Sequence, residues 1–121
     1  MKMKQIKKIY KHNLKFDSRL ELFFYELLKE SDIDFDFQVL YTLHPSFKYN
    51  KTTVRAMTLT VDFDFTKHGR NLIIDTKGFQ RPDNVLKWKL IKYKLRDTHP
   101  DIYLPKNQKQ CKELIDVIKK M

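Results

Sequence analysis

Residues 55–79 read RAMTLTVDFDFTKHGRNLIIDTKGF and contain two segments with the pattern of β-strands. The first segment, 55–67, alternates apolar and polar residues, which is typical of a strand with one buried face. The residues expected on the apolar face are Leu59, Val61, Phe63 and Phe65, and those on the opposite face are Thr60, Asp62 and Asp64. The turn KHGRN leads into the second segment, 72–77, so the sequence predicts a β-hairpin.

These strands carry charged residues in a pattern that suggests chemistry. Residues two apart in a strand share a face, so Asp75 and Lys77 are expected to project together, opposite Ile74 and Thr76. If the strands pair, Asp62 can approach Asp75 at one edge of the sheet. Two close carboxylates repel each other and raise one pKa unless a cation lies between them, and Mg²⁺ bound by oxygen ligands would relieve that repulsion.

A lysine beside such a metal could orient or deprotonate a water and neutralise charge on a phosphate. This arrangement is typical of metal-dependent phosphodiester hydrolysis, and Lys77 would be that lysine. Each residue also has a structural interpretation. Asp75 and Lys77 could form a surface pair on an edge strand, Asp62 could be solvated like Asp64, and Glu21 could be only a helix cap.

The rest of the chain predicts three helices and two further strands. Helix-like apolar spacing covers 18–31, where Ser18 and Glu21 form a capping-box pattern, and helices are also expected at 81–96 and 107–120. Strands are expected at 38–43 and 101–105, with a loop or hairpin end at 45–53. The order α-β-β-β-α-β-α predicts a single α/β domain over 1–121, with a mixed β-sheet core flanked by helices.

The composition favours a nucleic-acid partner. Lys and Arg number 25 against 15 Asp and Glu, a net charge of +10, and a strongly basic domain attracts polyanions. Anionic membrane is the second candidate. It is disfavoured because no helix is expected to combine a lysine face with an exposed apolar face. The single Cys111, with no signal peptide and no membrane-spanning run, predicts a reducing intracellular compartment.

Two basic segments are the candidates for contacting phosphates. Residues 1–15 form a lysine-rich arm, part of which is expected to be a short helix because Ile6, Tyr10 and Leu14 recur at helical spacing. The helix at 81–96 carries a second patch, whose alternative is an ordinary solvated face. Trp88 and Tyr93 are expected in the core rather than stacked on bases. The predicted DNA-binding lysines are Lys7, Lys8 and Lys11 in the arm and Lys87, Lys89, Lys92 and Lys94 in the helix.

At these residues the sequence resembles the PD-(D/E)XK nuclease superfamily. It resembles more closely a family of small phage proteins related to phage endonuclease I, a Holliday-junction resolvase. The matching pieces cover roughly residues 16–95 in the order of that family: FDSRLE (16–21), VLYTLHPSFKYN (39–50), TVDF (60–63), IIDTKGF (73–79) and LKWKLIKYK (86–94). Many relatives carry a proline just before the motif aspartate, where this chain has Val61.

The resemblance implies a restriction-endonuclease-like fold and a role for each site residue. Asp62 would bridge the metals and Asp75 would be the metal ligand of the D-x-K motif, with the backbone carbonyl of Thr76 as a further ligand. Glu21 would contact a second metal directly or through water, and Lys77 would be the catalytic lysine. For Glu21, the metal role is favoured over the capping role.

The resulting functional hypothesis is a Mg²⁺-dependent endonuclease, with Mn²⁺ able to substitute. It would be a cytoplasmic phage protein acting on DNA in replication or recombination. Branched DNA such as a Holliday junction is the substrate that the resemblance implies. A homodimer is expected because two strands must be cut. The alternative from another class is a non-catalytic, basic DNA-binding protein whose carboxylates are structural.

Overall fold

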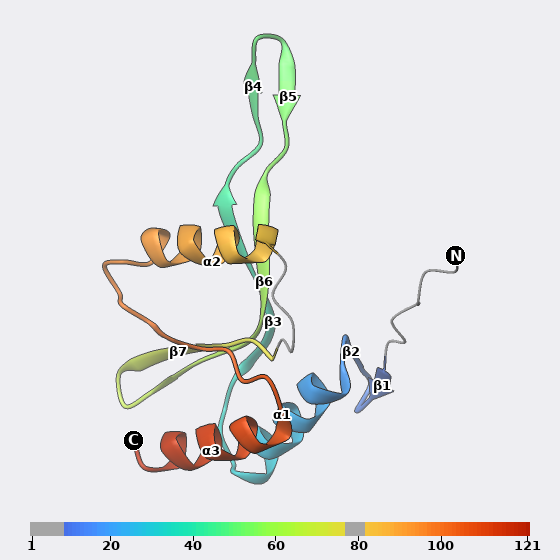
Figure 1. The fold of residues 1–121 in the computed structure, drawn as a ribbon, viewed down its shortest axis with the longest axis vertical. Coiled ribbons are helices and arrows are strands. Elements are labelled where there is room, and N and C mark those ends of the chain that lie inside the picture. Colours follow the sequence, from blue (N-terminus) through green and yellow to red (C-terminus); the bar gives the residue numbers. More distant parts are fainter. Residues whose placement is uncertain (1–8, 77–81) are drawn as a thin grey trace.

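A computed structural model describes residues 9–76 and 82–121. The main elements form three layers, with helices on both faces of a four-stranded sheet (Figure 1). This confirms the predicted α/β class and the order of the main elements. No helix in these ranges is long and apolar enough to cross a membrane.

The central sheet is mixed, in the order β3-β6-β7-β8. Strands β3 (Asp36–His44), β6 (Met57–Lys67) and β7 (Arg70–Ile74) are antiparallel, and β8 (Asp101–Tyr103) runs parallel to β7. The predicted hairpin between β6 and β7 is confirmed. Its turn residues His68 and Gly69 both have positive φ, at 51° and 77°, as a tight type I′ connection requires.

One face of the sheet is covered by two helices that lie side by side, α1 (Arg19–Glu30) and α3 (Gln108–Lys119). Both begin at residues whose side chains accept a hydrogen bond from the first helical turn, Ser18 and Asn107, which satisfies an amide that the helix cannot. Each helix buries an apolar stripe against the sheet. The fully buried residues of this cluster are Phe16, Phe24, Leu28, Phe63, Leu72, Ile74, Cys111 and Ile118.

The other face is covered by α2 (Pro82–Lys94), with proline at its first position, where the missing N–H costs nothing. Trp88 and Ile91 pack there against Ile73 and the far half of β6, including Val61. The sequence placed the four apolar residues of β6 on one face, but Leu59 and Val61 belong to this second cluster, while Phe63 and Phe65 belong to the first.

The division occurs where the ladder between β3 and β6 is interrupted. Gln38 has a φ of 54°, and the register pairs Phe37 with Phe63 and Val39 with Val61 without pairing Gln38. The backbone N–H of Asp62 donates instead to a side chain of another segment. Simple alternation along the strand therefore does not predict which cluster each apolar residue joins.

Two small hairpins complete the fold. The predicted helix in the N-terminal arm is wrong for residues 9–15, because β1 (Ile9–Lys11) and β2 (Leu14–Phe16) pair antiparallel. The turn residues His12 and Asn13 both have positive φ, which a helix cannot accommodate. The other hairpin joins β4 (Phe47–Tyr49) to β5 (Thr52–Val54) and projects beyond the body of the molecule, at the far end of β3 and β6 (Figure 1).

Candidate functional site

Two of the predicted site aspartates are in direct contact. Asp75 directly follows β7, and its Oδ1 accepts a hydrogen bond from the backbone N–H of Asp62 on β6, at 3.1 Å. The backbone N–H and the hydroxyl of Thr76 donate to Oδ2 of Asp62, at 2.7 and 2.8 Å. All three residues are buried. The predicted proximity of the two aspartates is confirmed, but the contact joins the Asp75 carboxylate to the backbone of Asp62, and β6 and β7 are the inner strands of the sheet.

The position of the Thr76 side chain differs from the prediction. Alternation placed it on the face opposite Asp75, but β7 ends at Ile74 and both residues contact Asp62. The sequence supplied only a backbone carbonyl role for Thr76. Its hydroxyl instead donates to the carboxylate of Asp62. A threonine beside a motif aspartate does not predict this contact.

Glu21 reaches the same region from α1. Its side chain is 1% exposed. One carboxylate oxygen accepts from the backbone N–H of Asp17 at 2.8 Å, and the other accepts from the side-chain amide of Gln38 at 3.3 Å. The amide of Glu21 itself donates to the hydroxyl of Ser18. Ser18 is therefore the helix cap, and the Glu21 carboxylate reaches back to the residue before that cap and also contacts Gln38 on β3.

The electrostatics of Glu21 connect it to the aspartates. Burial, and next the negative charge of Asp62, raise the pKa of the Glu21 carboxyl from 4.5 to about 7. The hydrogen bonds from Asp17 and Gln38 offset this only partly. A carboxyl whose pKa is strongly raised by burial and by a second carboxylate is a common feature of functional sites.

Gln38 is the residue of this region that sequence reasoning missed. It lies on β3 with a positive φ, and its amide group also donates to the backbone carbonyl of Lys15 at 2.9 Å. It thereby joins the N-terminal hairpin, the first helix and the sheet. A glutamine in an otherwise β-forming segment gives no signal of this role, because the contact depends on how three distant segments pack.

Other predicted residues cannot be placed in the site. Lys77 lies outside the described residues, as do Lys7 and Lys8 of the arm. Across 9–76 and 82–121, no group of three or more His, Cys, Asp or Glu side chains is arranged to hold a metal ion. Among the described residues, Asp62 and Asp75 contact each other, and the negative charge of Asp62 helps to raise the pKa of Glu21.

Asp64 belongs to a separate polar network. It accepts hydrogen bonds from the hydroxyl of Tyr41 and, at 2.8 Å, from the side-chain amide of Asn71. Burial, followed by the hydrogen bond to Asp64, raises the pKa of Tyr41. Asp64 is partly exposed and links three strands, and none of these bonds connects it to Asp62.

The lysines of α2 lie in two pairs rather than in one row. Residues seven apart on a helix share a side, as do residues three apart. Lys87 therefore lies with Lys94, and Lys89 lies with Lys92. The ammonium group of Lys94 donates to the carbonyl of Thr42 on β3. In the arm, Lys11 forms an ion pair with Glu26 at 2.9 Å.

Between the two lysine pairs, α2 exposes apolar side chains. Leu86 and Tyr93 are 52% and 67% exposed, and Leu90 lies between them; these three form the α2 ridge. Tyr93 is therefore not in the core, and the expectation that no helix combines lysines with an exposed apolar face is wrong. The sequence could not decide this, because α2 is apolar on more sides than the sheet can cover.

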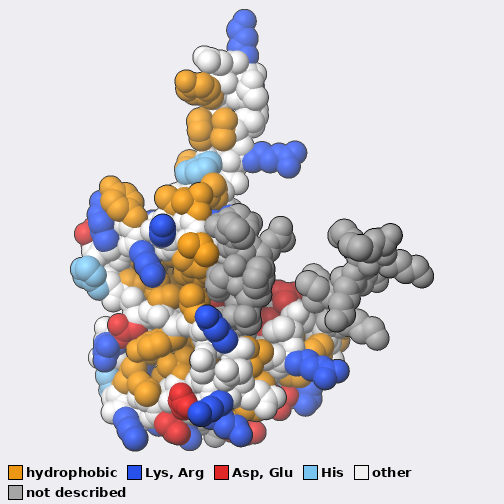
Figure 2. All heavy atoms as spheres, viewed as in Figure 1, with side chains coloured by type: hydrophobic (Ala, Val, Ile, Leu, Met, Phe, Trp, Pro, Cys, Tyr) orange, Lys and Arg blue, Asp and Glu red, His pale blue; other side chains and the backbone are white. Residues whose placement is uncertain are grey.

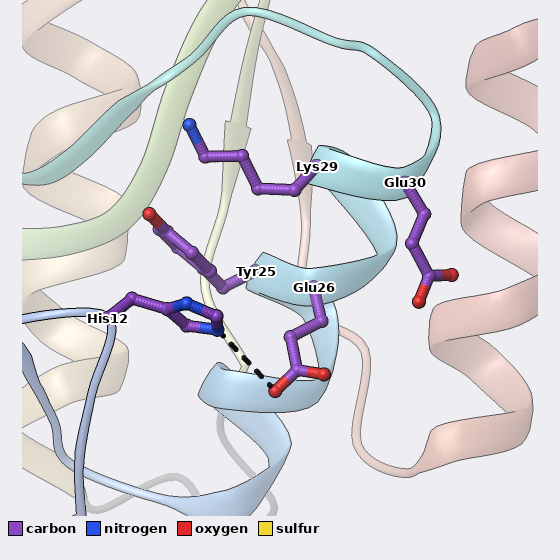
Figure 3. A pocket seen from close by; sticks show the side chains of 5 residues that line it. All are labelled: His12, Tyr25, Glu26, Lys29 and Glu30. Atoms are coloured by element: carbon purple, nitrogen blue, oxygen red, sulfur yellow. Dashed lines mark ion pairs between the residues drawn. The ribbon is translucent and has the colours of Figure 1, made fainter.

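A pocket of about 360 Å³ opens between the N-terminal hairpin and α1 (Figure 3). In it, Tyr25 stacks on His12 with ring centroids 5.6 Å apart, and Lys29 lies 5.7 Å from the Tyr25 ring centre. The carboxylate of Glu26 faces His12 at 3.9 Å. The contacts of His12 with Tyr25 and Glu26 hold the N-terminal hairpin against α1.

The fold and the buried carboxylates define a basic α/β protein with a polar site between its first helix and its sheet. Residues 1–117 match the family described as "Protein of unknown function (DUF1064)", and the chain belongs to that family. No curated protein and no solved structure matches it.

Proposed function

We propose that this protein is a metal-dependent endonuclease that hydrolyses phosphodiester bonds in DNA. The observation that carries the proposal is the burial of Glu21, Asp62 and Asp75 in one region, with the pKa of Glu21 raised by burial and by Asp62. Holding negative charge in such a place is costly. A site that receives a divalent cation gives these residues a function.

The donor set is chemically suited to Mg²⁺, which prefers carboxylate and carbonyl oxygens, keeps several waters and needs only one or two protein carboxylates. Asp62 and Asp75 would hold it, with the carbonyl of Thr76 as a further oxygen, and Mn²⁺ would substitute. This pair is compatible with the absence of a larger ligand group among the described residues. A bound metal would supply Lewis acidity and an activated water.

The protein's own groups have distinct tasks in this proposal. Thr76 orients the carboxylate of Asp62 through two hydrogen bonds. Glu21, with a pKa of about 7, can hold or release a proton near neutral pH, which suits a group near a reacting water. Lys77, assigned from the resemblance, would neutralise charge on the phosphate.

The substrate class rests on charge and on the resemblance. The net charge of +10 favours a polyanion, and Lys87, Lys89, Lys92 and Lys94 would contact phosphates from α2. Branched DNA, homodimer formation and a site of action in the cytoplasm of a phage-infected bacterium follow from the resemblance to phage resolvases.

One observation favours a second candidate, a DNA-binding protein without activity. The carboxylates of Glu21, Asp62 and Asp75 each accept hydrogen bonds that stabilise the fold. A purely structural role would account for those bonds, but it would not explain why Glu21 is buried near the charge of Asp62, where its pKa is raised.

Cleavage of a labelled four-way junction separates the candidates. The wild-type protein and Asp75→Asn are compared with Mg²⁺ and with EDTA, beside linear duplex and single-stranded DNA. We expect the wild type to cut the junction only with Mg²⁺ and the variant to lose at least about a hundredfold in rate, because a metal ligand is removed.

Asp64→Asn is the matched control. It makes the same change from carboxylate to amide, but at a residue of β6 that is bonded to Tyr41 and Asn71. It should cut like the wild type. Binding of DNA that is indifferent to Mg²⁺, with no cleavage of any substrate, would establish the second candidate. Cleavage of all three substrates alike would keep the nuclease and remove the preference for branches.

A further inference from the structure

The hairpin of β4 and β5 is built to project. Its strands are three residues each and are joined by Asn50 and Lys51, both with positive φ, the geometry of a tight type I′ turn. Figure 1 shows it extending well beyond the three layers, at the end of the long β3–β6 pair. Five of its six strand residues are exposed, so it contributes little to the core.

One side of this hairpin is an aromatic face. Phe47 and Tyr49 are two residues apart and therefore point to the same side, and they pair with Val54 and Thr52. The Phe47 and Tyr49 side chains are 47% and 65% exposed. The ring of His44 meets that of Phe47 at 5.7 Å in an edge-on contact, which extends the face toward the body of the protein.

The charge around this face is entirely basic. Between Asp36 and Asp62 the sequence contains no acidic residue, and it contains Lys48, Lys51 and Arg55. Lys51 lies in the turn and Arg55 follows β5, so cations stand at both ends of the aromatic face. Figure 2 shows hydrophobic and basic side chains, and no acidic ones, on the visible side of the projecting hairpin.

We propose that the aromatic face of this hairpin binds unpaired bases of a nucleic-acid strand. Phe47 and Tyr49 would stack on successive bases, and Lys51 and Arg55 would contact the phosphates beside them. Aromatic rings set in a basic surface recognise single strands in this way, because every base offers a flat face. A second copy of this chain, with its net charge of +10, would gain from the rings but not from the cations.

This proposal deepens the proposed function, since unpaired bases occur where strands branch or separate. The rings of Phe47 and Tyr49 belong to a separate two-stranded sheet from the strand that carries Asp62. The hairpin is exposed, so substitutions at its rings should leave the fold intact.

The test measures binding of a fluorescent single-stranded oligodeoxynucleotide containing 2-aminopurine, by anisotropy and by quenching of the 2-aminopurine, in EDTA. Tyr49→Leu keeps an apolar side chain but removes the ring, and we expect it to weaken binding roughly 5- to 100-fold and to reduce the quenching. Tyr49→Phe keeps the ring and should bind within about twofold of the wild type, as stacking requires.

Val117→Ser is the control, because that apolar side chain is 49% exposed on α3, apart from both the hairpin and the lysines of α2, and DNA binding should change little. Lys51→Ala should lower the slope of log affinity against log salt by about 0.7, as loss of one single-strand phosphate contact predicts. Tyr49→Leu should leave that slope unchanged.

Three results would overturn the proposal: wild-type protein that does not bind the single strand, Tyr49→Leu that binds like wild type, or Tyr49→Leu that converts a dimer into a monomer in sedimentation without altering DNA affinity. None of these outcomes depends on cleavage. Failure of the nuclease proposal would appear separately, as Mg²⁺-dependent activity that is absent or indifferent to Asp75→Asn.

Discussion

The two faces of the central sheet differ in how completely the helices that cover them bury their apolar side chains. On the side of α1 and α3, aromatic rings interlock, with the ring of Phe63 within 5.2 to 5.5 Å of Phe24, Phe35 and Phe37. On the side of α2, two helix residues, Trp88 and Ile91, are buried, and the α2 ridge is exposed. Both helix layers are rich in apolar residues, so composition alone does not separate them.

This difference suggests that one face mainly stabilises the fold and that the other is available for binding. We expect the densely packed face to contribute more to the free energy of folding than the α2 face, because it buries more apolar side chains. The carboxylate site lies where α1, from the densely packed side, meets the sheet. The α2 side and the projecting hairpin keep apolar and basic groups in solvent, where they are available for a partner.

The largest expected effect is at the centre of the dense face. Phe63→Ala should lower the free energy of unfolding by about 3–5 kcal/mol, because a large buried ring leaves a cavity. Equilibrium urea unfolding followed by circular dichroism measures this. Phe63→Leu, which keeps part of the volume, should cost clearly less. A loss under about 1 kcal/mol for the alanine variant would contradict the packing described for this cluster.

The next effect is the pH dependence that Glu21 gives to stability. Its pKa is about 7 in the folded chain against an ordinary 4.5, so between these values the folded state binds more protons than the unfolded state. The stability contribution of protonated Glu21 is fully present below pH 4.5 and is lost as the pH rises through 7. The free energy of unfolding should fall by up to about 1.4 kcal/mol per pH unit in that window.

Urea unfolding from pH 5 to 8, in EDTA, measures this slope, and Glu21→Gln should flatten it. Comparison with the variant isolates the contribution of Glu21 to the slope. Glu26→Gln is the control, since the hydrogen bond from Lys11 lowers the pKa of Glu26 and keeps its titration below the window. An equal slope in wild type and Glu21→Gln would refute the shift.

The smallest effect is expected on the α2 ridge. Leu86→Ser, at a position that is 52% exposed, should change the free energy of unfolding by no more than about 0.5 kcal/mol, because surface substitutions rarely do more. The same unfolding measurement tests it. A loss above about 1.5 kcal/mol would mean that the ridge is covered in solution, and the contrast between the two faces would disappear.

Sequence patterns predicted the elements well where local chemistry decides them. The capping pattern at Ser18, the apolar stripe of α1 and the turn at His68 and Gly69 each act over a few residues. The helix prediction for the arm is wrong over residues 9–15, because the helical spacing of Tyr10 and Leu14 is a coincidence. The turn at His12 and Asn13 gives β1 a partner strand instead.

The site was predicted in part for the same reason. Charges on two adjacent strands of a hairpin must lie near each other, so the proximity of Asp62 and Asp75 follows from chain connectivity and strand geometry. The contacts of Gln38 and the hydroxyl of Thr76 depend on where the ladder breaks and where β7 ends. Those positions are set by packing between segments, which no local pattern records.

The sequence by itself determined the α/β class, the order of the main elements, the basic charge and the pairing of the two aspartates, because periodicity, caps, turns and composition act locally or additively. Only the tertiary structure decided that the Glu21 carboxylate is buried near Asp62, where burial and the charge of Asp62 raise its pKa. It also decided that α2 exposes its ridge and that the aromatic hairpin stands free. Each of these depends on which surfaces the sheet can cover, and that is fixed by the packing of segments far apart in the chain.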